Sequence, residues 1–133
     1  MNRSTLTLAL CAGLLSAVTG CSGFDRLDFT YRSAPADNAS VTYEAVRMHE
    51  GIAVGVAARP MDDDEQMDTD TVVQLETKNP GVVQVAPAPR DEDLEEDAPY
   101  EFVIWGVAAG EASLGVIIDG ELEGEIPVFI EAQ

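Results

Sequence analysis

The sequence predicts an all-β fold, a two-sheet β-sandwich of about seven strands. Beyond residue 20, no window keeps the apolar spacing of an amphipathic helix for long. Several short windows instead alternate apolar and polar side chains with period two, and Gly, Pro, Asn or Asp residues bound them. Short strands at this spacing in about a hundred residues are typical of a sandwich, with a small closed barrel as the alternative.

The composition supports a compact fold and argues against one class of partner. The 133 residues include 25 Asp and Glu against 7 Lys and Arg, which gives a formal net charge of -18. Hydrophobic residues make up 46% of the chain, too large a share for a disordered acidic protein. Because carboxylates repel phosphate groups, we expect no nucleic-acid partner.

The first part of the domain contains two or three predicted strands. Residues 27–31 alternate, and they form either a first strand or part of a tether. Residues 41–48 predict a weaker strand, whose alternation slips at Ala45 as it would at a bulge. Residues 52–58 are small or apolar on both faces, which predicts a central strand.

The middle of the chain carries the clearest alternation. Residues 73–78 predict a strand with one face in water, and the turn at 79–81 leads to a further strand at 83–85. Residues 112–118 present a row of apolar side chains to one face, and the Asp-Gly pair at 119–120 predicts a hairpin turn after them.

Two further segments are predicted as strands from their apolar content. Residues 100–107 are apolar on both faces, so this strand is expected to be buried. Trp105 within it is expected to anchor the core, and a surface position for ligand stacking is the alternative. Residues 126–130 contain Pro127, which cannot donate a backbone hydrogen bond and therefore predicts an edge strand.

The N-terminus has the pattern of a secretory signal peptide. A positive start at residues 1–3 precedes an apolar stretch at residues 6–18. That stretch is too short for a transmembrane helix, which needs roughly 20 apolar residues. Residues 1–20 are therefore predicted to be cleaved.

The end of this segment, Val18-Thr19-Gly20-Cys21, resembles a bacterial lipobox. The resemblance implies that the Cys21 thiol is alkylated with diacylglycerol and that Cys21 becomes the acylated first residue. Ser22 resembles the sorting pattern for the outer membrane. An ordinary cleaved signal is the alternative. Lipidation would leave no cysteine pair for a disulfide, because Cys11 lies in the removed segment.

The second half of the chain resembles the group 2 bacterial immunoglobulin-like domains, over roughly residues 50 to 131. Residues 77–85 resemble the family's polar-Asn-Pro-x-Val-x-x-Val segment. Residues 106–116 resemble its Gly-Val-Ala-x-Gly-x-Ala turn and strand, and residues 126–130 resemble its closing strand. The resemblance implies an immunoglobulin-like sandwich that acts as a rigid spacer or an adhesive module without a shared active site.

The chain departs from this family in two places. Leu75 lies near the position of the family's usual Trp, and an acidic insertion at residues 87–99 replaces a short turn. Between its flanking strands, the turn bracketed by Gly106 and Gly110 is expected to use positive φ angles. The predicted organisation is a signal peptide at 1–20, a lipidated cysteine and tether at 21–38 that includes a first strand in one interpretation, and the sandwich at 39–133.

The residue types do not favour an enzyme. The single histidine, His49, lies near a predicted turn, and the sequence has neither a Gly-x-Ser-x-Gly elbow nor a Cys/His cluster for zinc. Catalysis by a pair of carboxylates is the enzymatic hypothesis that the many acids leave open, but it would need a shaped cleft.

Two acidic segments, at 61–70 and 91–97, are predicted loops and weak candidates for calcium, which takes six to eight oxygen ligands. Solvated loops that repel each other are the main interpretation, because Met67 occupies the place where an EF-hand turn needs Gly. The candidate ligands are Asp62, Asp64, Asp68, Asp91 and Asp93.

Together these features predict a non-catalytic protein of the bacterial cell envelope that is anchored by a lipid at Cys21. The outer membrane is the expected location, with an envelope protein or a polysaccharide as the expected partner. The alternative is a calcium-dependent adhesive module that uses the two acidic segments. The sequence does not indicate an oligomeric state.

Overall fold

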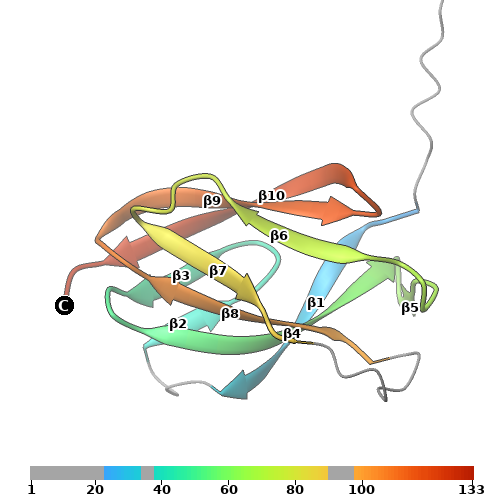
Figure 1. Ribbon diagram of the computed structural model, residues 1–133, viewed down its shortest axis with the longest axis horizontal. Helices are drawn as coiled ribbons and strands as arrows, with labels where there is room; N and C mark the ends of the chain where they lie inside the picture. The colour runs from blue at the N-terminus through green and yellow to red at the C-terminus, as the bar shows by residue number, and fades with distance from the viewer. Residues whose placement is uncertain (1–22, 34–37, 90–97) are drawn as a thin grey trace, which may run out of the picture.

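The computed structural model describes residues 23–33, 38–89 and 98–133, which form two β-sheets and no helix (Figure 1). This confirms the predicted all-β sandwich. Within these ranges, no helix is long and apolar enough to cross a membrane. In chain order the strands are β1 (Arg26–Ser33), β2 (Ala39–Val41), β3 (Val46–His49), β4 (Ala53–Asp62), β5 (Glu65–Gln66), β6 (Val73–Thr77), β7 (Val83–Pro87), β8 (Tyr100–Gly106), β9 (Gly110–Ile118) and β10 (Glu121–Glu131).

Each sheet has five strands. The first, here called the β4 sheet, has the order β1-β4-β8-β7, and β5 pairs with the end of β4. The second, the β10 sheet, has the order β2-β3-β10-β9-β6. The pairing of β10 with β3 is parallel, whereas the other ladders are antiparallel. The central position predicted for residues 52–58 is confirmed, because β4 lies between β1 and β8.

The core lies between the two sheets, where every second residue of the central strands points inward. Each large aliphatic side chain that is fully buried contributes about 1.5–3 kcal/mol to folding. The rows predicted along residues 73–78 and 112–118 face this core. The largest fully buried side chains are Leu27, Val46, Val54, Val56, Val83, Ile104, Leu114, Val116, Ile118, Ile126 and Val128.

The segment at 27–31 is a strand rather than a tether, since it lies within β1 and pairs with β4. Leu27 is buried in the core. The Tyr31 hydroxyl accepts a hydrogen bond of 2.8 Å from the backbone N–H of Val41 in the opposite sheet. β1 therefore joins the two sheets along one side of the sandwich.

The segment at 41–48 was expected to be one bulged strand, and this is wrong. It contains the end of β2 and most of β3, which pair with each other across a turn. The Thr42 N–H donates to the Ala45 carbonyl at 3.0 Å, and the Ala45 N–H donates to Thr42 Oγ1 at 3.2 Å. The slip in alternation at Ala45 marks a reversal of the chain, which lets Val41 and Val46 both point into the core.

The expectation that residues 126–130 form an edge strand is also wrong, because β10 lies between β3 and β9. Pro127 is opposite Ser113 of β9, but the ladder with β3 starts only at Val128. The proline therefore precedes the stretch in which an N–H is needed on the β3 side.

Residues 100–107 were expected to be buried on both faces, and only one face is. Phe102 and Ile104 of β8 point into the core, whereas Val103 is 39% exposed. Trp105 has the same orientation as Val103, lies outside the buried core cluster and is only partly buried. The prediction that Trp105 anchors the core is therefore wrong, because strand alternation places it on the outer face.

Two predicted turns are present, and they need their glycines for different reasons. Asp119 and Gly120 have φ angles of 50° and 85°, as a tight hairpin turn between β9 and β10 requires. At the other turn, Gly110 has a φ of 153°, as predicted, whereas Gly106 does not use a positive φ. A Cβ at Gly106 would instead lie 2.9 Å from the His49 carbonyl oxygen and 3.2 Å from Ile130.

We predict that Gly106→Ala lowers the free energy of unfolding by about 1–3 kcal/mol, since the added methyl meets backbone that cannot move aside. Urea denaturation measures this change. Gly81→Ala is the control, because its Cβ would come no closer than 3.3 Å to a side-chain oxygen of Asn79. An equal loss in the two variants would contradict the packing explanation.

Candidate functional site

Several predicted site residues lie outside the part of the chain that the structure describes. These are the lipidation candidate Cys21 and the calcium candidates Asp91 and Asp93. Asp62, Asp64 and Asp68 are described; Asp62 is the last residue of the long central strand β4, and the other two follow it.

The acidic segment at 61–70 is partly a hairpin rather than a loop. Asp62 ends β4 and pairs with Glu65 of β5. Asp63 at the turn has a φ of 52°, a left-handed conformation that Asp tolerates better than most residues. The hairpin directs the side chain of Asp64 fully into solvent.

Arg26, at the start of β1, lies among the carboxylates of this region. Its Nε donates to Asp28 Oδ1 at 2.9 Å and its Nη1 donates to Asp25 Oδ2 at 3.0 Å. Nη1 also donates to the Asp63 carbonyl, and Nη2 lies 3.7 Å from Asp64 Oδ1. The hydrogen bonds to Asp28 and then Asp25 raise the pKa of the guanidinium above its ordinary value, so Arg26 stays charged. The role of Arg26 as a counterion could not be predicted from the sequence, because its partners come from two separate segments.

The structure does not assemble the described calcium candidates into a metal site. Among residues 23–33, 38–89 and 98–133, no group of three or more His, Cys, Asp or Glu side chains is placed to hold a metal ion. Asp64 faces Arg26, and Asp68 lies beyond β5, where its carbonyl accepts the Thr71 N–H at 3.0 Å.

A second feature is the outer surface of the β4 sheet around the single tryptophan, here called the Trp105 face. Trp105 lies between Ala53 of β4 and Gln84 of β7, and the next outward residue, Val103, lies between Gly55 and Ala86. None of the six carries a charge. The opposition of Phe102 and Ile104 to Val103 and Trp105 was visible in the sequence, so the signal for an outward tryptophan was present. The six residues are Ala53, Gly55, Gln84, Ala86, Val103 and Trp105.

The nearest ion pair on this surface is self-contained. Arg32 of β1 reaches across β4 to Glu101 of β8, with 2.9 Å between Nε and Oε1. The crossing is short because β4 presents only the small residues Gly55 and Ala57 outward at this level. The pair therefore adds little net charge beside the Trp105 face.

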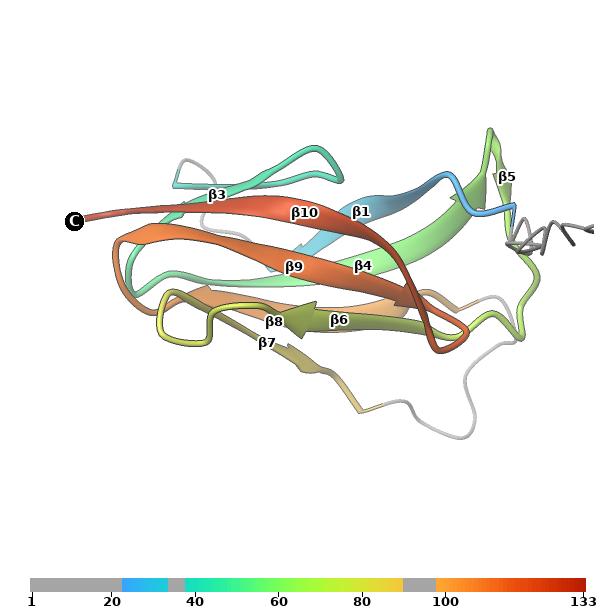
Figure 2. The same cartoon turned by 90° about the horizontal axis from the view of Figure 1, so that it is seen from above.

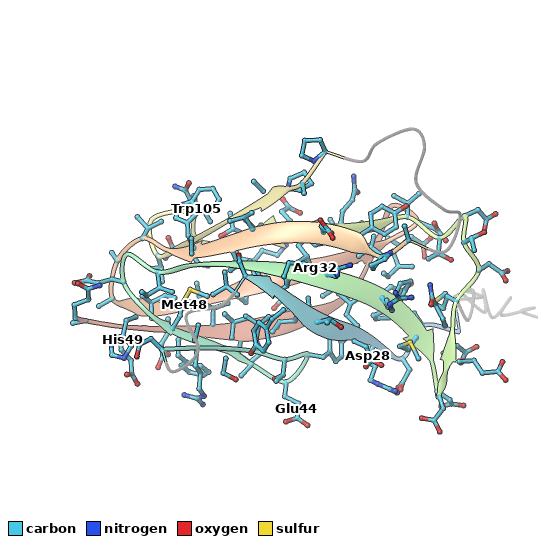
Figure 3. The ribbon with its side chains drawn as sticks, turned by 90° about the horizontal axis from the view of Figure 1, so that it is seen from below. Asp28, Arg32, Glu44, Met48, His49 and Trp105 are labelled. Atoms are coloured by element: carbon cyan, nitrogen blue, oxygen red, sulfur yellow. The ribbon has the colours of Figure 1, made fainter. Side chains whose placement is uncertain are left out.

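His49 lies at the end of β3, close to the last residues of the chain. Its Nε2 is 3.6 Å from Glu131 Oε2, and its Nδ1 is 3.3 Å from the carbonyl oxygen of Ala132. These contacts connect the end of β3 to the end of β10 and to the residue after it. In Figure 3, His49 and Trp105 lie toward one end of the molecule and Asp28 lies toward the other.

Comparisons with known proteins give one match among solved structures. No protein family and no curated protein matches the chain. The crystal structure of the S-layer protein SbsC domains 4 and 5 matches with a TM-score of 0.46 and 12% sequence identity. The match covers 77% of this chain and 53% of the solved one, so this chain spans about half of that length.

Calcium binding is tested by thermal melts of the domain from Gly23 onward, in calcium and then in chelator. We expect the two curves to coincide, because Arg26 already supplies a positive charge among Asp25, Asp28 and Asp64. A ligand that binds only the folded state would raise the melting temperature. A higher melting temperature in calcium would therefore contradict this prediction and support the calcium-dependent alternative.

Proposed function

We propose that this protein is a lipid-anchored component of the bacterial cell envelope whose immunoglobulin-like sandwich is a non-catalytic interaction module. The outer membrane is its proposed location. The observation that carries the interaction role is the outward position of the single tryptophan. A protein that served only as a spacer would gain more stability from this large side chain if it were buried in the core.

The lipid anchor is supported by the lipobox-like residues before Cys21 and by the start of the fold. The chain is already hydrogen-bonded to β4 at Asp25, whose N–H donates to the Met61 carbonyl at 2.8 Å. A cysteine a few residues earlier is well placed to connect a compact domain to a membrane.

The proposed partner is a neutral polysaccharide, bound at the Trp105 face. In a chain with a net charge of -18, this face has no charged residue in its two rows, so it suits a partner without charge. An aromatic ring offers a flat apolar surface for a sugar ring, and the Gln84 amide beside it offers hydrogen-bonding groups. Hydrogen-bonded β-strands hold these groups in fixed positions, which lowers the entropic cost of binding.

We predict that Cys21→Ala abolishes membrane attachment. The protein should accumulate either in soluble form or as an unprocessed precursor, because the thiol that receives the lipid is absent. Metabolic labelling with a fatty acid, followed by fractionation of the envelope, measures this outcome. Unchanged labelling of the variant would contradict the anchor.

We also predict that Trp105→Ala weakens binding of neutral oligosaccharides by roughly tenfold or more, since truncating a central tryptophan costs about 2 kcal/mol at binding surfaces. Emission from Trp105 reports binding to the wild-type domain, and calorimetry compares the variants, with hexasaccharides of glucose and of N-acetylglucosamine as probes.

Phe129→Ala is the matched control. Phe129 is an aromatic residue on the outer face of the other sheet, where the Arg47 guanidinium lies 4.3 Å from its ring centroid. This variant should bind as the wild type does. Unchanged Trp105 emission at millimolar sugar, or equal losses in the two variants, would overturn the proposed surface.

A further inference from the structure

The point at which the chain enters the sandwich is held by several contacts. The ring of Phe24 packs edge-on against Tyr43, with 6.0 Å between centroids and an interplanar angle of 81°. The Asp25 N–H donates to the Met61 carbonyl, and a Cβ at Gly23 would lie 2.8 Å from Asp62 Oδ2. The chain is therefore attached to one end of the sandwich from Gly23 onward.

This attachment limits how far Cys21 can lie from the domain. Cys21 lies two positions before Gly23, and a fully extended chain spans at most about 3.6 Å per residue. Whatever conformation residues 21 and 22 adopt, the Cα atom of Cys21 lies within about 7 Å of that of Gly23. A lipid on Cys21 would hold this end of the domain next to the bilayer.

The end of the sandwich near Gly23 is strongly acidic, and it is called the acidic end below. It contains the turn between β4 and β5 and the start of β1, which Figure 2 shows opposite the C-terminus. Negative charge extends to the neighbouring turn, where burial and then Asp25 and Glu123 raise the pKa of Tyr43. The carboxylates there outnumber the cations Arg26 and Arg59. The acidic end comprises Asp25, Asp28, Asp62, Asp63, Asp64 and Glu65.

The Trp105 face lies at the other end of the same strand. β4 starts at Ala53, which is opposite Trp105, and ends at Asp62 in the acidic end. A strand rises about 3.3 Å per residue, so roughly 30 Å separate the two regions.

We infer that the acidic end faces the bilayer surface and that the Trp105 face points away from it, toward a partner beyond the membrane. This inference rests on the proposed lipid at Cys21. Charges interact over about 8 Å at physiological salt, a distance similar to the reach of residues 21 and 22. The carboxylates are therefore close enough to be repelled by anionic headgroups. The acidic end should therefore lie closer to a neutral bilayer than to an anionic one.

The experiment uses the full lipidated protein in vesicles with a nitroxide on the lipid headgroup. Asp64→Cys places a fluorophore at the acidic end, and Ala109→Cys places the same fluorophore at the exposed turn before β9. The mature protein would have no other free thiol. Vesicles without nitroxide give the reference intensity for each variant.

In phosphatidylcholine vesicles, we expect a marked loss of intensity for the label at residue 64 and almost none for the label at residue 109. Adding phosphatidylglycerol at low salt should reduce the loss at residue 64, and high salt should restore it. Equal loss at both positions, or a larger loss at residue 109, would overturn the orientation. Failure of the protein to float with vesicles would overturn the lipid anchor itself, and is distinguishable because flotation is measured before quenching.

Discussion

Burial of aliphatic side chains between the two sheets is the interaction on which the rest of the structure depends. The net charge of -18 opposes a compact state through repulsion, and both cysteines lie outside the described residues. The interior must therefore supply the stability of the described domain. It does so through inward rows on the central strands, where Ile104, Leu114 and Ile126 are among the fully buried side chains.

The requirement for this core also determines where the charges lie. Inward positions on the central strands are apolar, so the carboxylates are confined to outer faces and turns. Two of the charged groups on the β4 sheet are balanced locally, Arg26 by the aspartates around it and Arg32 by Glu101. Asp25, Asp28 and the acids of the β4-β5 hairpin lie at the end where the chain enters, whereas the two rows around Trp105 at the opposite end of the same sheet carry no charge.

The small residues on the outer face of β4 allow side chains of β1 to lie across the sheet. Ala53, Gly55 and Ala57 present little side chain outward. Their small size allows the Arg32 side chain to cross β4 to Glu101, and it lets Ser33 of β1 approach Gly55. A Cβ at Gly55 would lie only 2.9 Å from Ser33 Oγ. The central strand therefore contributes apolar residues to the core and leaves room on its outer face for side chains of β1.

The sequence by itself determined the fold class, most of the strands, the turn at Asn79 and the hairpin turn at Asp119, because these depend on local alternation and turn chemistry. Tertiary structure decided the neighbours of each strand. The central place of β10 could not be predicted from Pro127, since a proline is tolerated wherever the adjacent ladder has not yet started. The reversal of the chain at Ala45 could not be predicted either, because it gives the same local pattern as a bulge.

The candidate site also depends partly on local sequence pattern and partly on tertiary structure. The acidic segments were evident from the sequence, but the position of Arg26 among them depends on pairing between β1 and β4. The outward direction of Trp105 followed from strand alternation, whereas apolar content alone indicated the core. Alternation is a property of the backbone of one strand, and it decides which face of the sheet each side chain points to. Burial depends on whether another layer covers that face, and only the folded chain determines this.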